Sequence, residues 1–350
     1  MASLQFWAYA PELGWRNIES IYTWAVVFFL TVNICNNRVK FWMVVGTMML
    51  ASLKMSLFGA RTWVSSGFSF SSWGIAGPGG FLSNSGEYSV QMLIWFALAY
   101  WFVMAAKPYL SKWMFRLAVL AGPTSAAMSI MAASSRGAQL ALLFLLYYIF
   151  MKGRLRFRTV IITAVLGVAV YFALPAEQQA RFTEMGTDRT SVQRLLYWEH
   201  GIDIVERYPA LGIGYFGFIP YYNRHWPQDV MFESAELPHN IIVQVATDTG
   251  LIGLSLYFIL IFRALRMTKV MSKPHIDGST CVDAFAAKAL AAGLWGFLIA
   301  GQFVTITYYP FLWVQVALIT SLWNISKKTE KERKLALKRE RNETYVKVNP

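Results

Sequence analysis

The sequence predicts an all-α polytopic membrane protein, and three observations lead to this fold class. Hydrophobic residues make up 56% of the 350 residues and charged residues only 15%, which is far too apolar for a soluble domain of this length. The mean hydropathy of +0.41 agrees with this balance. Apolar runs that approach the roughly 20 residues needed to cross a bilayer recur along the chain. We therefore expect about nine transmembrane helices in a single integral membrane domain over 1–350.

Each expected span is an apolar run bounded by polar or basic residues. The runs lie at 20–36, 41–59, 88–106, 114–133, 137–151, 159–175, 240–262, 284–304 and 308–325. We find no tandem repeat among them and no second, soluble domain. The longest polar interruption is 176–239, which is expected to form one large loop outside the membrane.

Basic residues fall in short clusters between the apolar runs, which is the positive-inside pattern of membrane proteins. The net charge of +13 would also suit nucleic acid, but no basic stretch carries a fold that binds it. The clusters are Arg38 and Lys40, Lys107 to Arg116, Lys152 to Arg158, Arg263 to Lys273, and the tail over 326–350. Placing all of them in the cytoplasm puts the N-terminus, 60–87, 134–137, 176–239 and the 305–307 turn outside.

The 176–239 loop has an unusual composition. It holds nine of the nineteen acidic residues, three of the four histidines, five arginines and no lysine. Arginine is as disfavoured as lysine on the outer side of a membrane, so arginines without lysines indicate a specific role. The planar guanidinium binds phosphate oxygens bidentately and stays charged at any relevant pH.

One amphipathic helix is expected inside this loop, from Thr190 to Tyr208. Thr190 or Ser191 can cap it, and Pro209 ends it before a glycine-rich turn. Its apolar stripe either packs on the helix bundle or lies in the membrane interface. Arg194 lies beside the stripe, where it could point into a cavity. The stripe consists of Leu195, Trp198, Ile202 and Val205.

Several segments together resemble the O-antigen ligase and polymerase superfamily of bacterial membrane glycosyltransferases, over about 68–265. Their order, spacing and placement relative to the spans make the resemblance specific. The segments are Ser135-Arg136-Gly137-Ala138, Ser191 to Trp198, Tyr208 to Gly214, His239-Asn240, and Gly250 to Leu254. The segment from Trp73 to Phe81, followed by Asn84, also resembles a branch labelled O-glycosylation ligases.

This resemblance implies a GT-C-like fold and a definite reaction. The enzyme would take a glycan from undecaprenyl pyrophosphate on the outer face of the bacterial cytoplasmic membrane. It would transfer that glycan to an acceptor hydroxyl, with inversion at the anomeric carbon and without a metal or cofactor. The expected partners are the lipid-linked donor, membrane lipid, and an acceptor glycolipid, glycan or protein. The sequence leaves open whether the acceptor is lipid A core, a growing glycan or a protein hydroxyl.

The resemblance and the residue chemistry together give the candidate site. Arg136 and Arg194 would neutralise the charge that builds on the leaving pyrophosphate. His239 would orient or deprotonate the acceptor, since an unperturbed histidine has a pKa near 6.5. The alternatives are a snorkelling arginine, a solvated or ion-paired helix face, and a helix-capping histidine. The expected substrate-binding residues are Arg136, Arg194, Arg189, Arg207 and Asp248.

A metal site is not expected. His200, His225 and His239 lack the helical or Cys/His spacing of known metal sites, and the two cysteines suggest neither a metal site nor a disulfide framework.

Two other function classes compete with an enzyme. A transporter or flippase for lipid-linked sugars would place polar groups near the bilayer midplane and often shows inverted repeats. Here the polar groups collect in one loop and no repeat is apparent, which favours the enzyme. A non-catalytic partner in exopolysaccharide assembly is the other alternative.

Overall fold

The computed structural model describes residues 6–69, 74–151, 157–173, 175–184, 186–273 and 282–348. Across these ranges the regular secondary structure is helical, and no strand occurs in them. The prediction of an all-α polytopic membrane protein is therefore confirmed. Trp73 of the resemblance, Cys281 and three of the expected cytoplasmic basic residues (Lys152, Arg154 and Arg156) lie outside the described residues.

Every expected span coincides with a helix of the described chain. The helices are α2 (Glu19–Ile34), α3 (Arg38–Ser65), α4 (Ser85–Ala106), α5 (Lys112–Val119) with α6 (Ser125–Ala132), α7 (Arg136–Met151), α8 (Phe157–Ala173), α12 (Ile241–Met271), α13 (Val282–Ala300) and α14 (Pro310–Val348).

Six of the described helical stretches are long and apolar enough to cross a membrane. They are 11–34, which joins α1 (Pro11–Asn17) to α2, then α3, α4, the α5–α6 stretch, α12 and α13. The described parts of α7 and α8 are shorter than a full span. In the apolar half of α14, the polar residues Gln315 and Asn324 lower the mean hydropathy. The count of nine spans therefore remains a prediction.

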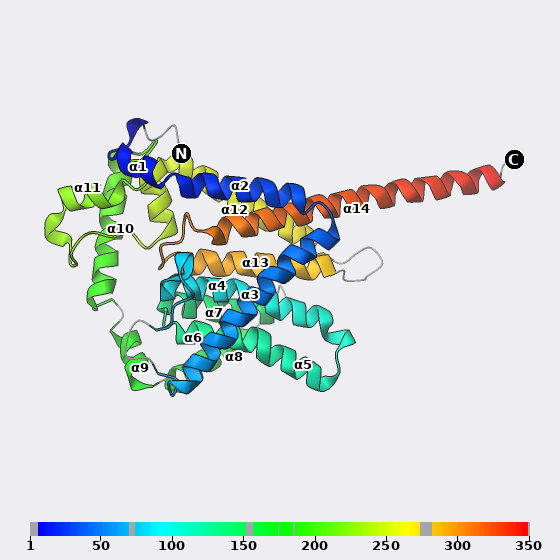
Figure 1. The fold of residues 1–350 in the computed structure, drawn as a ribbon, viewed down its shortest axis with the longest axis horizontal. Helices are drawn as coiled ribbons and strands as arrows, with labels where there is room; N and C mark the ends of the chain where they lie inside the picture. The colour runs from blue at the N-terminus through cyan, green and yellow to red at the C-terminus, as the bar shows by residue number, and fades with distance from the viewer. Residues whose placement is uncertain are drawn as a thin grey trace.

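Helix α13 lies in the middle of the bundle and packs most extensively against α4, then against α7 and α12 (Figure 1). Its buried residues are mainly alanine and glycine, including Ala287, Ala292 and Gly296. Small residues let membrane helices approach closely, and this close packing drives their association in lipid.

Helix α12 is broken about a third of the way along, at Gly250, where φ is +64°. The segment after Pro209 fills the break. Ile213 N donates to Thr247 O at 2.8 Å, and Leu251 N donates to Pro209 O at 2.7 Å. The backbone groups that the break exposes are thus satisfied by protein, as they must be within a membrane.

Glycine is required on both sides of this contact. A Cβ on Gly212 would collide with the backbone at Thr247 and Gly250, and a Cβ on Gly250 would collide with Ala210. Both glycines also have positive φ, which side chains disfavour. Two of the segments that carry the family resemblance, 208–214 and 250–254, are therefore partners in one structural contact.

A small helical layer stands at one end of the bundle (Figure 1). It contains α9 (Ala176–Thr183), α10 (Arg189–Arg207) and α11 (Phe218–His225), so the expected helix from Thr190 to Tyr208 is present. Its own apolar core contains Tyr197, Ile204, Ile213, Phe218, Tyr221, Tyr222 and Ala235. The basic half of α14 projects from the opposite end of the bundle (Figure 1).

The expected stripe of α10 does not form the buried face of that helix. Leu195 and Ile202 are more than half exposed, and the helix buries Gln193, Tyr197, Gly201 and Ile204 instead. The buried residues of α10 are therefore not its most hydrophobic ones, because tyrosine and glycine also pack well against a helix. The exposed face has the pattern of a helix that lies in a membrane interface.

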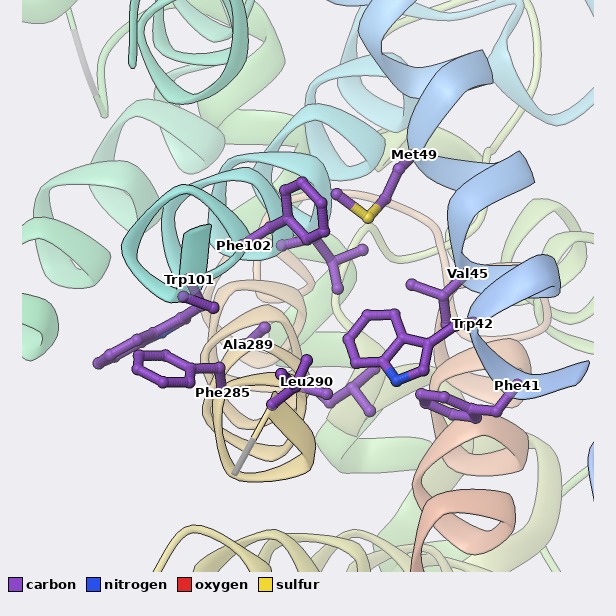
Figure 2. A pocket seen from close by; sticks show the side chains of 13 residues that line it. Phe41, Trp42, Val45, Met49, Trp101, Phe102, Phe285, Ala289 and Leu290 are labelled. Carbon is purple, nitrogen blue, oxygen red and sulfur yellow. The ribbon is translucent and has the colours of Figure 1, made fainter. Parts of the chain in front are cut away.

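An apolar cavity lies among α3, α4 and α13, close to the beginning of α13 (Figure 2). Trp42, Trp101, Phe102 and Leu290 line it, and no charged side chain does. The other end of α13 is about 28 Å away, from its length and the rise of an α-helix. That other end lies beneath the α9–α11 layer (Figure 1).

Candidate active site

One face of α10 holds the segment that precedes α12. Arg194, Tyr197 and Trp198 share this face, because they are spaced by three and four residues. The Tyr197 hydroxyl accepts from Glu236 N at 2.8 Å, and Trp198 Nε1 donates to Pro238 O at 2.9 Å. Arg194 therefore lies beside the 236–239 segment.

His239 and Asn240 form the beginning of α12. Asn240 caps the helix, since its side-chain oxygen accepts from Ile242 N at 2.9 Å and from Val243 N at 3.1 Å. His239 immediately before it has a φ of +50°. The tight turn leaves the His239 side chain outside the helix.

The His239 imidazole has two polar partners. Nε2 lies 3.0 Å from Glu236 Oε2, and Nδ1 lies 2.9 Å from Thr305 Oγ1. Burial lowers the pKa of His239, Glu236 opposes this and Arg194 adds to it. His239 is therefore neutral near pH 7, which is the state that a general base requires. The hydrogen bond from His239 holds the pKa of Glu236 below its usual value.

Arg136 is the first residue of α7 and is tied to the start of α10. Its Nη1 lies 3.0 Å from Asp188 Oδ2, its Nη2 lies 3.4 Å from Asp188 Oδ1, and Nη2 also donates to Ser191 Oγ at 3.3 Å. Asp188 caps α10 by accepting from Ser191 N at 3.1 Å. Burial would raise the pKa of Asp188, but these hydrogen bonds outweigh it and lower the pKa to about 2.

Arg194 has no comparable partner. Its buried Nε makes no hydrogen bond within the described residues, and none of the ion pairs found there includes it. Burial lowers the pKa of Arg194, and the positive charge of Arg136 lowers it further. An anion bound here would compensate a guanidinium that is costly to bury alone.

The turn after α13, over 301–309, lies against the beginnings of three other helices. Thr305 contacts His239 as described, and Ile241 N donates to Gly301 O at 2.8 Å. A side chain at Gly137 would collide with Phe303, and one at Gly86 would press on Val304. The glycine of the Ser135-Arg136-Gly137 segment thus permits close packing of α7 against this turn.

Arg194 lies within electrostatic reach of both Arg136 and His239. The sequence predicted that these three residues act together, and they lie in one polar cluster at the end of the bundle that carries the α9–α11 layer (Figure 1). Arg189 lies next to Asp188, and its guanidinium stacks on the Phe232 ring at 4.6 Å.

Arg207 and Asp248 lie apart from this cluster. Arg207 is about 20 Å along α10 from Arg194, by helix geometry, where its guanidinium lies over the Trp226 ring at 5.8 Å. Asp248 is fully buried in α12 and accepts from the Tyr308 hydroxyl at 2.9 Å. Both contacts are of the kind that stabilises the fold.

The other two histidines of the loop are held by aromatic neighbours. His200 stacks on Trp226 at 4.2 Å and lies 2.8 Å from Asp229 Oδ2, and His225 stacks on Tyr221 at 4.0 Å. Within the described residues, no group of three or more His, Cys, Asp or Glu side chains could hold a metal ion.

Four residues of the cluster were not expected from the sequence: Asp188, Ser191 as an Arg136 partner, Glu236 and Thr305. Asp188 could have been found as the capping residue before an amphipathic helix. Glu236 gave a weaker signal, three residues before His239. Thr305 gave none, because only the fold brings its turn to His239.

Two comparisons with known proteins bear on this cluster. No curated protein sequence matches the chain. Residues 119–258 match the family model described as O-antigen ligase, a range that contains Arg136, Arg194, His239 and the other three predicted site residues. This match supports the resemblance to the O-antigen ligase superfamily over that part of the chain.

Proposed function

We propose that the chain transfers a glycan from an undecaprenyl-pyrophosphate carrier to an acceptor hydroxyl. Its family implies glycan transfer of the O-antigen ligase or polymerase type. The observation that carries the proposal is Arg194, whose buried Nε has no hydrogen-bond partner within the described residues, beside Arg136 and the neutral His239. Such a cluster suits an anionic leaving group and a hydroxyl nucleophile.

In the proposed reaction, Arg194 and Arg136 bind the pyrophosphate and His239 accepts the proton of the acceptor hydroxyl. The acceptor oxygen attacks the anomeric carbon while the bond from that carbon to the pyrophosphate oxygen breaks. Pyrophosphate leaves with the bonding electrons, and the configuration inverts in this single displacement. The arginines stabilise the charge that develops on the leaving group, so the mechanism is expected to need neither a metal nor a cofactor.

We place the protein in the bacterial cytoplasmic membrane, with the 176–239 loop on the outer side and the 326–350 tail in the cytoplasm. The cluster lies where α7 and α12 begin, so the headgroup of a membrane lipid could reach it. Acceptors in this orientation include lipid A core, a growing cell-surface glycan and a protein hydroxyl.

The break in α12 is a feature that would also suit a transporter. Discontinuous helices of transporters bind substrates at their exposed backbone ends. In this chain the break is filled by the backbone of 209–213 through two hydrogen bonds, which leaves those groups no role in substrate binding. This supports the enzyme over the transporter.

The test is transfer of a lipid-linked glycan to acceptor by the reconstituted protein, with EDTA present. Arg194→Ala is expected to lower kcat/KM by roughly 100–1,000-fold, the usual cost of removing one group that stabilises a developing anion. Arg224→Ala is the matched control, since Arg224 is exposed on α11. Equal transfer by both variants at equal membrane levels, or a requirement for divalent ions, would contradict the proposal.

A further inference from the structure

Glu236 contacts His239 but has no role in the proposed reaction as described above. Its carboxylate lies 3.0 Å from His239 Nε2, while the Thr305 hydroxyl lies 2.9 Å from Nδ1 of the same ring. We infer that Glu236 is a positioning residue that fixes the tautomer of His239, and that Nδ1, where Thr305 now binds, receives the acceptor hydroxyl and its proton. The assignment of a substrate to this atom rests on the proposed function.

The tautomer follows from the hydrogen-bonding chemistry of the partners. An ionised carboxylate only accepts, so Nε2 must carry the hydrogen and donate it to Glu236. A neutral imidazole has one donor and one acceptor nitrogen, so Nδ1 is unprotonated and accepts from the Thr305 hydroxyl. The lowered pKa of Glu236 agrees with an ionised carboxylate.

The spacing of Glu236 and His239 is fixed by α10. Tyr197 holds the backbone of Glu236, and Trp198 holds Pro238. Arg194, one turn earlier on α10, lies on the same face. Carboxylate, imidazole and guanidinium are thus positioned by one helix, as a site with defined geometry requires.

The acceptor oxygen gives its proton to His239 Nδ1 as it bonds to the anomeric carbon, and the pyrophosphate leaves with the electron pair of the broken bond. The resulting imidazolium donates from Nε2 to Glu236, whose negative charge stabilises it. Glu236 itself stays ionised, and it neither receives the proton nor touches the substrate.

The inference predicts a shift in pH dependence. The charged groups that face His239 are Glu236 from its own segment and Arg194 from α10, while Thr305 from the 301–309 turn is neutral. In Glu236→Gln the amide oxygen still accepts from Nε2, but the attraction that raises the pKa of His239 is lost. Because transfer needs the neutral ring, the rise of kcat/KM with pH should move to lower pH, by up to about one unit, since water screens the carboxylate of Glu236, whose side chain is 62% exposed.

The first measurement does not depend on transfer. In the full chain carrying ¹⁵N-histidine, nuclear magnetic resonance should show an unprotonated Nδ1 for His239, with its signals identified by their loss in His239→Gln. The titration of His239 should move to lower pH in Glu236→Gln and stay in place in Glu233→Gln. Glu233 is the matched control because it is exposed in the same segment. A proton on Nδ1, or equal titrations in the two variants, would overturn the inference.

The second measurement uses the same variants in the transfer assay. Glu236→Gln should lower kcat by roughly 10–100-fold, the range found for groups that orient a histidine, and should shift the acid limb of the profile. Thr305→Val should keep kcat and lower the acceptor KM, because the acceptor no longer displaces a hydroxyl. A hundredfold fall in kcat instead would make Thr305 a proton relay and overturn the placement of the acceptor.

The two measurements separate this inference from the proposed function. If the wild-type protein transfers glycan but Glu236→Gln behaves as Glu233→Gln at every pH, the inference is wrong and the proposed function stands. If the tautomer and its shift are as expected but the wild-type protein transfers nothing, the proposed function is wrong and the role of Glu236 in fixing the tautomer stands.

Discussion

Arg136 and Arg194 differ in what binds them before any substrate arrives. Arg136 is paired with Asp188 through two contacts, whereas Arg194 has a buried Nε without a partner in the described part of the chain. Arg136 therefore holds the start of α10 against α7 as well as contributing charge. Arg194 has more to gain from an anion, since Asp188 and Glu236 offset its desolvation only in part.

This difference predicts a graded response to substitution at Arg136. Arg136→Ala should lower kcat/KM by roughly 100–1,000-fold, and Arg136→Lys should recover only part of it, because an ammonium cannot make the two-point contact. Asp188→Asn should give a smaller loss than Arg136→Ala, since it weakens the pair but keeps the guanidinium. Full activity of Arg136→Lys at equal protein levels would show that charge alone suffices.

The contribution of the Arg136–Asp188 pair to stability depends on pH. The Asp188 pKa of about 2 in the folded protein lies below the unfolded value of about 3.9. The pair therefore contributes stability above about pH 4 and loses it as the pH falls toward 2. Transfer measured above pH 5 should thus report His239 and not this pair.

At single residues, the sequence predicted the groups with distinctive chemistry and missed their partners. Arg136, Arg194 and His239 belong to recognisable segments, so they could be expected to act together. Thr305 is 66 residues from His239 and Asp188 is 52 residues from Arg136. Such pairings depend on how helices pack, which the local sequence does not encode.

Among the elements, α12 depends most on a distant segment. Its break at Gly250 is stable because 209–213 supplies hydrogen bonds, and both sides of this contact require glycine. The two segments could be recognised in the sequence, but their contact could not, since nearly forty residues with their own helix separate them.

The same contact gives a test at the level of the element. Gly250→Ala should destabilise the protein strongly, because the added Cβ collides with the backbone of Ala210 at a positive φ; strain of that φ alone costs about 1–3 kcal/mol. Gly46→Ala in α3 is the control, since open space surrounds that position and alanine favours helix. Thermal unfolding in detergent measures both. A Gly250→Ala protein as stable as the control would contradict the account of the break.

The spans were easier to predict than their details. The expected run 114–133 is a helix with a π-helical turn at Leu120–Thr124, around Pro123, because proline lacks the amide hydrogen that an α-helix needs there. The expected span 308–325 begins a helix that continues to Val348. Apolar runs mark where a helix crosses lipid, and do not mark where it ends.

For the whole molecule, the polar α9–α11 layer and the basic half of α14 lie at opposite ends of the helix bundle (Figure 1). That separation is what the distribution of basic clusters in the sequence requires if the loop faces outward and the tail faces the cytoplasm. The apolar cavity of Figure 2 lies near the beginning of α13, away from the arginine cluster.

The orientation can be tested with single cysteines in a chain whose Cys35 and Cys281 are replaced by serine. The two variants are Gln228→Cys and Lys331→Cys. Gln228 is exposed in the α9–α11 layer, and Lys331 is exposed on the projecting part of α14. A membrane-impermeant thiol reagent added to intact cells should label position 228 and leave position 331 unlabelled until the membrane is permeabilised. The reason is that arginine and lysine near spans are retained in the cytoplasm, and Lys331 lies in the most basic stretch. Labelling of 331 in intact cells, with 228 protected, would reverse the orientation and put Arg136, Arg194 and His239 on the cytoplasmic side.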